Sequence, residues 1–301
     1  MRILIPVDGS SFSKSAVNFV ASRTTLIQQQ PDVELLNVQY PVSARVGRAA
    51  GKGLVESYQV SESNKVLKPC MATLKHAGLM ARAKYVVGSP GSAVGKIAAE
   101  DAADLIVMGS HGHTGFRSVL FGSVTHAVLA SCTTPLLVLR GDVAPKKDSL
   151  RIGIALDGSK YGVAAARFIA KQRDLFGVAP VVTLMHVVPD LLNLVVPGYF
   201  GGQPLRVVEP EQVEAMQRAA FEQAVAVPKK LLEAAGLQVN EVRLTGNNPG
   251  DEIAACVKKN KLDVLALGSH GRGALRTLTL GSVSTRVAAK CQAPLLLIRL
   301  A

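Results

Sequence analysis

A glycine motif occurs twice in this 301-residue chain with the same internal spacing. Each copy reads Gly-Ser-His-Gly, then nine residues, then Gly-Ser, and each lies between two apolar runs. The repeated glycines and serines are Gly109, Gly112, Gly122 and Ser123 in the first copy, and Gly268, Gly271, Gly281 and Ser282 in the second. The chain is therefore a tandem repeat, with one candidate phosphate-binding loop in each half.

The repeat extends over the whole of both halves. An apolar run ending in Asp8-Gly-Ser opens the first half, and one ending in Asp157-Gly-Ser opens the second. The offset is 149 residues there and 159 at the glycine motif, so the second half holds about ten extra residues, which we place in the Pro/Gly-rich stretch 190–210. We expect domains at residues 1–142 and 150–301, with residues 143–149 as a linker.

Apolar runs alternate with helical patterns in each half, which predicts an α/β fold. In the first half we expect strands over residues 2–8, 35–40, 81–87, 105–109 and 136–140, and helices over 11–29, 55–76, 92–102 and 122–130. Each half should form a five-stranded, mostly parallel, Rossmann-like sheet with helices on both faces. Ligands of such sheets bind outside the carboxyl ends of the strands, where the Asp8 turn and the glycine loop both lie.

The glycine loop has features that suit an anion. Gly109 ends a strand and is expected to turn the chain with positive φ, while Gly112 has no side chain to block a ribose or phosphate. Gly122-Ser123 begins a helix, where free N–H groups and the Ser123 hydroxyl can donate to phosphate. Arg117 and Arg276 lie inside the nine-residue spacers and can pair with phosphate. The alternative is that the glycines serve only turns and close packing.

Three residue types at the strand ends leave alternatives open. Asp8 and Asp157 suit either a ribose, adenine or Mg²⁺ contact or the capping of a helix, with Ser10, Ser11 or Ser13 as other possible caps of the first helix. His111 and His270 follow serines, but no nucleophile with an orienting acid accompanies them, so we expect them to anchor the loop. No GxxxxGK[ST] loop, kinase signature or GxSxG elbow is present. The sequence indicates nucleotide binding more clearly than catalysis.

Composition narrows the classes of function that fit this chain. The net charge of +12 divides evenly between the halves, but the basic residues are scattered and no aromatics accompany them, so nucleic-acid binding is not favoured. A basic surface does favour anionic ligands such as nucleotides. No signal peptide or bilayer-spanning stretch is visible, and the four cysteines have no metal-binding spacing. We therefore expect free thiols and a cytoplasmic location.

The repeated motif resembles the G-2x-G-9x-G-[S/T] pattern of the universal stress protein family. The opening Ile-Leu-Ile-Pro-Val-Asp-Gly-Ser of residues 3–10 and the stretch 104–116 agree with that family too. The chain is similar to two such domains fused in tandem over nearly its whole length. Because the subgroup with this motif binds ATP, the resemblance implies ATP binding, with or without Mg²⁺, in both halves.

The resemblance also implies which residues would contact the nucleotide. Strand-one residues and the valine of strand two would contact adenosine, and the glycine loop and following helix would contact ribose and phosphates. The implied residues of half one are Pro6, Val7, Asp8, Val38, Gly109, Gly112, Arg117, Gly122, Ser123 and Val124. Those of half two are Ala155, Leu156, Asp157, Val187, Gly268, Gly271, Arg276, Gly281, Ser282 and Val283. The fifth strands would pair across a pseudo-twofold axis, as in family dimers.

The chain departs from the family pattern at a few places. His113 stands where a basic arginine is common, and His126 and Thr285 stand where the family often has glutamate. The extra loop at 190–210 is placed to cap or crowd the second site.

We therefore expect a cytoplasmic, ATP-binding stress-response regulator with slow or no turnover, at most a weak ATPase or an autophosphorylating protein. Its protein partner is unknown, and a further dimerisation of the tandem chain is left open. The alternative is an interaction scaffold with vestigial pockets. An adenylate-forming enzyme of the related α-hydrolase-like group is disfavoured, because the S-G-G-x-D-S loop expected there is absent.

Overall fold

The computed structural model describes residues 1–111, 121–141, 144–145, 147–191, 209–268 and 280–300. The elements of the first half are β1 (Arg2–Pro6), α1 (Ser11–Ala21), α2 (Thr24–Gln28), β2 (Asp32–Gln39), α3 (Ala44–Ala50), α4 (Lys52–His76), β3 (Ala81–Val87), α5 (Pro90–Glu100), β4 (Leu105–Gly109), α6 (Ser123–Ser131) and β5 (Leu136–Leu139). Those of the second half are β6 (Arg151–Leu156), α7 (Lys160–Lys171), the 3₁₀ turn η1 (Arg173–Phe176), β7 (Val181–Val188), α8 (Pro210–Ala234), β8 (Gln238–Thr245), α9 (Pro249–Lys259), β9 (Val264–Gly268), α10 (Ser282–Lys290) and β10 (Leu295–Ile298).

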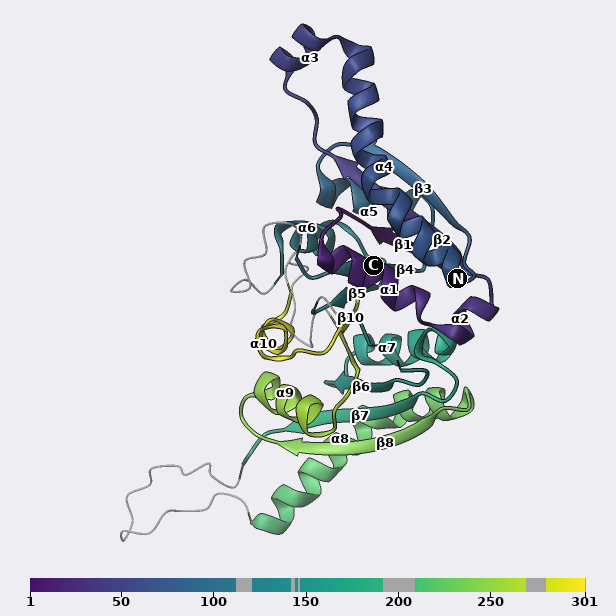
Figure 1. The fold of residues 1–301 in the computed structure, drawn as a ribbon. Coiled ribbons are helices and arrows are strands. Elements are labelled where there is room, and N and C mark those ends of the chain that lie inside the picture. The colour runs from purple at the N-terminus through teal and green to yellow at the C-terminus, as the bar shows by residue number, and fades with distance from the viewer. Residues whose placement is uncertain (112–120, 142–143, 146, 192–208, 269–279, 301) are drawn as a thin grey trace, which may run out of the picture.

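The strands form one sheet that runs through both halves (Figure 1). Its order is β3-β2-β1-β4-β5-β10-β9-β6-β7-β8, so each half contributes five strands in the same relative order. Neighbouring strands within each half are parallel, and the halves meet where β10 runs antiparallel to β5, with Leu296 opposite Leu137. The predicted α/β fold with two tandem five-stranded repeats is thus confirmed, and the fifth strands pair as the resemblance implied.

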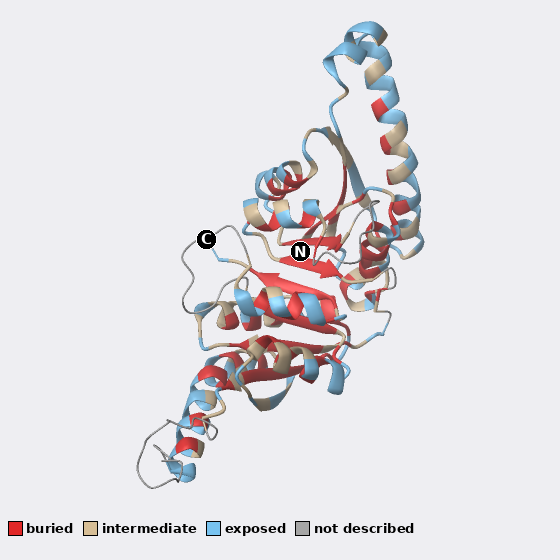
Figure 2. Ribbon diagram, turned by 90° about the vertical axis from the view of Figure 1, so that its left-hand side faces the viewer, coloured by how far each residue is buried: buried red, intermediate tan, exposed pale blue. Residues whose placement is uncertain are grey.

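The core consists of two apolar layers, one on each face of this sheet (Figure 2). Alternate residues of a strand point into opposite layers, so Ile3 and Ile5 of β1 pack on one side and Leu4 on the other. Burial on both faces accounts for the near-continuous aliphatic runs of the central strands. The four cysteines are buried and free, and burial raises the pKa of the Cys70, Cys256 and Cys291 thiols.

Most elements lie within a few residues of their predicted bounds, and two of them differ from the prediction. The predicted helix 11–29 divides at Ser22–Arg23 into α1 and α2. Arg23 as a whole residue is 1% exposed. Its guanidinium lies 5.1 Å from the Phe19 ring centroid and donates to the Pro145 carbonyl at 2.8 Å. This long-range contact holds Arg23 in a non-helical conformation. Helix α3, which leads into α4, was not predicted.

Two half-buried arginines reach across the seam between the halves. Arg140 follows β5 and donates to the Ala288 carbonyl in α10 at 2.6 Å, while its guanidinium lies 5.4 Å from the Phe121 ring centroid. Arg299 follows β10 and donates to the Cys132 carbonyl, just after α6, at 2.8 Å. Burial lowers the pKa of both guanidinium groups. Each half thus satisfies carbonyls near the carboxyl end of a helix in the other half.

Gly109 has a different role from the one expected. It is not among the glycines with positive φ and lies in extended conformation at the end of β4, so the expectation of a positive-φ turn was wrong. A Cβ at this position would lie 2.6 Å from the Phe12 Cβ and 2.7 Å from its backbone carbonyl carbon. Gly109 therefore permits the close approach of α1 to the strand end.

No helix among the described residues is long and apolar enough to cross a bilayer.

We predict that Arg140→Ala lowers the free energy of unfolding by about 2 kcal/mol, because a charged hydrogen bond and a stacked cation are lost at a buried seam. Urea denaturation followed by circular dichroism measures this. Arg218→Ala is the control, since Arg218 forms an exposed i,i+4 pair with Glu214 and should change stability by less than about 1 kcal/mol. Equal effects of the two substitutions would contradict the role given to Arg140.

We predict that Gly109→Ala destabilises the protein by about 1–3 kcal/mol, because α1 must shift to accommodate the methyl group. The matched control is Gly88→Ala, where a Cβ would meet nothing within 4 Å. Melting temperatures of the two variants compare the sites directly. A Gly109→Ala protein as stable as Gly88→Ala would show that the close approach is not required.

Candidate functional site

The turn after each first strand is built around an aspartate and a glycine. Gly9 has a φ of 87°, which lets the chain reverse into α1. The Ser10 hydroxyl accepts from the Ser13 amide at 3.1 Å and so caps α1. Asp8 Oδ1 accepts from the Ser10 amide at 3.0 Å and from its hydroxyl at 2.6 Å. The cap is therefore Ser10, and Asp8 is held at the strand end by the capping residue.

The second half repeats this turn. Gly158 has a φ of 77°, and the Ser159 hydroxyl caps α7 by accepting from the Tyr161 amide at 3.3 Å. Asp157 Oδ1 accepts from the Ser159 amide at 2.9 Å. Both candidate aspartates thus have the same local geometry, and neither is the helix cap.

A polar side chain of the second strand fixes the carbonyl that precedes each aspartate. In half one, the buried Asn37 amide donates to the Val7 carbonyl at 2.7 Å. In half two, His186 Nδ1 lies 2.7 Å from the Leu156 carbonyl. Because a carbonyl only accepts, the His186 proton must be on Nδ1. Different side chains therefore hold the same backbone atom in the two halves.

Helices α6 and α10 begin directly beside the ends of the fourth strands. Their N-cap residues, Gly122 and Gly281, have extended φ and ψ, and no side chain caps either helix. The Thr125 hydroxyl donates to the Gly109 carbonyl at 3.3 Å, and the Ser284 hydroxyl donates to the Gly268 carbonyl at 2.8 Å. The first-turn amides, which have no intrahelical acceptors, are thereby held at the carboxyl edge of the sheet.

A cavity of about 280 Å³ lies at this edge in half one. Elements β1, α1, β2, α5, β4 and α6 contribute to its walls. The predicted residues that line it are Pro6, Val7, Asp8, Val38, Gly109, Gly122, Ser123 and Val124. The structure thus brings together eight of the ten residues implied for half one. The other two, Gly112 and Arg117, lie outside the described residues.

Several lining residues were not predicted. They are Ser13, Leu36, Tyr40, Pro90, Val94, Met108, His111 and Thr125. One signal was available in the repeat itself, because Pro90-Gly91 recurs as Pro249-Gly250 at the offset of the glycine motif. A Cβ on Gly91 would lie 2.2 Å from the Ala127 Cβ, so this glycine lets α5 pack closely on α6. The recurring pair therefore positions a cavity wall.

The predicted residues of half two lie at the corresponding edge. Ala155, Leu156 and Asp157 lie at the end of β6, Val187 near the end of β7 and Gly268 at the end of β9. Gly281, Ser282 and Val283 begin α10. The bonds of His186 and Ser284 tie these strand ends and this helix together, as described above. Gly271 and Arg276 lie outside the described residues.

His111 is one of the residues that line the cavity. Its Nδ1 lies 3.0 Å from the Ser110 hydroxyl, and its ring centroid is 5.5 Å from that of Phe12. These contacts fit a residue that anchors the loop after β4. Among the described residues, no group of three or more His, Cys, Asp or Glu side chains is placed to hold a metal ion.

Comparison with known proteins identifies both halves. The universal stress protein family matches residues 1–140 and again residues 149–299. A universal stress protein of Mycolicibacterium smegmatis is 26% identical over 99% of this chain and 96% of its own length. A universal stress protein of Methanocaldococcus jannaschii is 30% identical over 46% of this chain and 94% of its own length.

Solved structures agree on the fold. The crystal structure of a universal stress protein from Archaeoglobus fulgidus superposes with a TM-score of 0.68, at 20% identity, over 99% of this chain and 98% of that one. The family matches the chain twice in succession, and the structure has one sheet built from two equivalent halves. The chain belongs to the universal stress protein family and contains two of its domains in tandem.

Proposed function

We propose that the half-one cavity binds an adenine nucleotide, ATP, and that the equivalent edge of half two does so as well. The observation that carries this proposal is the cavity itself, which joins an aspartate, an apolar slot and an uncapped helix start. Its volume of about 280 Å³ is close to the lower end of the ~300–1,000 Å³ range of small-ligand sites.

Each part of the cavity suits one part of the nucleotide. Val7, Val38 and Met108 offer apolar surface to the adenine ring. The Asp8 carboxylate is placed to accept hydrogen bonds from the ribose hydroxyls or the adenine amine. The amides of Ser123 and Val124 and the Ser123 hydroxyl can donate to phosphate, and the helix dipole favours its negative charge. The net charge of +12 attracts the same ligand.

We propose a regulatory role with slow or no turnover. His111, the histidine at the cavity, is engaged with the Ser110 hydroxyl and the Phe12 ring, which favours an anchoring role over that of a general base. Any Mg²⁺ would enter with the phosphates, and Asp8 would be its nearest described carboxylate in the cavity lining. ATP then acts by binding one conformation of the protein more tightly than another. The cytoplasmic location remains a prediction.

We predict that the protein, purified without added nucleotide and then heat-denatured, releases ATP or ADP, as measured by chromatography and mass spectrometry. About two nucleotides per chain would show that both halves bind. If none is released, millimolar Mg-ATP should still raise the unfolding free energy by about 2.7 kcal/mol at 100 times its Kd. Neither release nor stabilisation would favour the scaffold alternative, with vestigial pockets.

We predict that Gly122→Glu abolishes nucleotide binding in half one, because it places a carboxylate where the phosphates should lie. Its extended φ of −63° and ψ of 161° allow a side chain at this position. Gly122→Gln is the control of equal size without charge and should weaken binding less. Gly281→Glu should act in the same way on half two. Isothermal titration of the single and double variants measures the site count, and full occupancy in the double variant would refute the assignment.

A further inference from the structure

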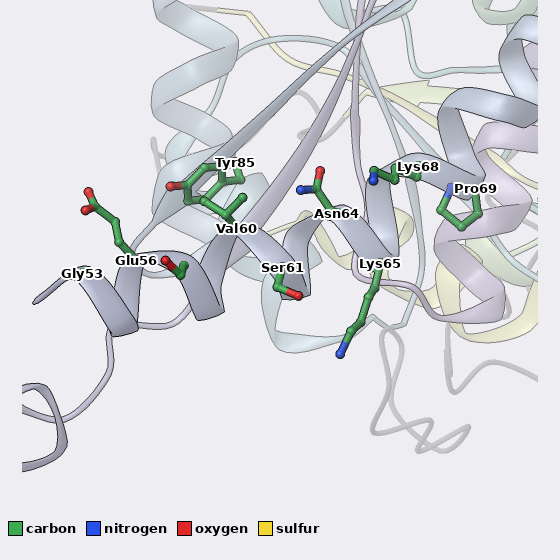
Figure 3. A pocket seen from close by; sticks show the side chains of 10 residues that line it. Gly53, Glu56, Val60, Ser61, Asn64, Lys65, Lys68, Pro69 and Tyr85 are labelled. Atoms are coloured by element: carbon green, nitrogen blue, oxygen red, sulfur yellow. The ribbon is translucent and has the colours of Figure 1, made fainter. Parts of the chain in front are cut away.

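A second, larger groove lies along helix α4 and shares no lining residue with the half-one cavity. Residues spaced three or four apart on one face of α4 line it, among them Glu56, Val60, Asn64, Lys65 and Lys68. Tyr85 of β3 contributes the other wall (Figure 3). The groove has a volume of about 930 Å³. A different stripe of α4, which includes Leu67, Cys70 and Leu74, is buried against the body of the protein, so the groove face is available.

In the second half, the equivalent helix is bonded to its edge strand in a different way. Helix α8 has the same length as α4, 25 residues, and its residues correspond to those of α4 at an offset of 158. Arg243 replaces Tyr85 there, and it forms an ion pair of 2.8 Å with Glu214, the equivalent of Glu56. A second ion pair joins Lys229 to Glu241, at the positions of Met71 and Ala83. Two ion pairs therefore join α8 to β8 in half two. At the equivalent positions half one has Tyr85, Met71 and Ala83, which carry no charge, together with Glu56.

The surface around the half-one groove is apolar and basic. Leu54, Tyr58 and Val60 of α4 expose 65%, 59% and 38% of their surface. Residues 44–76 contain six lysines and arginines but two glutamates, whereas residues 210–234 of α8 contain three basic and four acidic residues. Figure 1 shows α3 and α4 extending beyond one end of the sheet and α8 beyond the other. The arm formed by residues 44–76 thus combines a hydrophobic stripe with a positive surround.

We propose that the α4–β3 groove is a docking surface for an acidic, amphipathic α-helix of another protein. The lining of α4 extends from Gly53 to Pro69, about 24 Å of helix, which matches a partner of about four turns. Its apolar side would lie on Val60 and Tyr85. Its carboxylates would face Lys68 and would compete with the Glu62 carboxylate for Lys65. The net charge of +12 steers an acidic partner to this surface and opposes self-association.

Nucleic acid fits the groove less well. The apolar residues Val60 and Pro69 in the lining offer no hydrogen bonds to phosphates. Tyr85 is the one aromatic residue in the lining, so successive bases would lack a stacking surface.

The experiment uses the full chain and a fluorescein-labelled helical peptide of about 18 residues, with leucines at positions i, i+3, i+4 and i+7 and glutamates elsewhere. Fluorescence anisotropy should show saturable binding in the micromolar range, and the same peptide with lysine in place of glutamate should not bind. Tyr85→Arg installs the second-half ion pair with Glu56 and should weaken binding at least about tenfold. This variant gains a positive charge, so an effect of bulk charge alone would strengthen binding instead.

Two matched controls separate the groove from the rest of the surface. Arg243→Tyr makes the reverse exchange in half two and should leave peptide affinity unchanged. Val60→Glu should weaken binding at least about tenfold, while Val227→Glu, the same change at an exposed position of α8, should not. Melting temperatures check that each variant is folded.

Other outcomes would overturn the proposal. Failure of the acidic peptide to bind at about 1 mM, or equal affinity for wild type and Tyr85→Arg, would do so. Binding of a DNA oligonucleotide that is lost in Val60→Glu would assign the groove to nucleic acid. A dimer seen by sedimentation that dissociates in Val60→Glu would assign it to a second copy of this chain.

Discussion

The antiparallel pairing of β5 with β10 is the constraint on which the rest of the molecule depends. Three residue pairs join two five-stranded sheets into one. The pairing places β3 and β8 at opposite outer edges and brings α6 and α10 close enough for Arg140 and Arg299 to bond across the seam. Because these strands are buried on both faces, the seam is held by hydrophobic packing as well as by backbone hydrogen bonds.

The two halves reach the same local geometry with different side chains. Asn37 and His186 hold equivalent carbonyls, and Thr125 and Ser284 tie equivalent helix starts to strand ends. Backbone geometry at the carboxyl edge is thus shared, whereas the outer edges differ. At those edges, the ion pair of Arg243 with Glu214 is matched in half one by Tyr85 and Glu56. The two copies of the repeat are therefore alike at the carboxyl edge of the strands and different at the outer edges of the sheet.

Local periodicity and the repeat were sufficient to predict the strands at 81–87 and 105–109 within their observed bounds. The resemblance to the universal stress protein family implied eight of the residues around the half-one cavity. The division of the first helix was not predictable, because it depends on Arg23 meeting Pro145, which is distant in sequence. The role of Gly109 was misjudged for a similar reason, since the Phe12 backbone that it contacts comes from another element. Long-range packing decided each of these points.

The seam has a consequence for biosynthesis. Strand β5 is complete at Leu139, but its partner β10 begins at Leu295, so more than half of the chain is synthesised between them. During that interval the first domain presents an apolar edge strand, the kind of surface that recruits foreign strands and promotes aggregation. The short connection from β5 to β6 keeps the second domain tethered nearby, at high effective concentration. Tandem fusion thus makes closure of this edge an intramolecular event that does not depend on protein concentration.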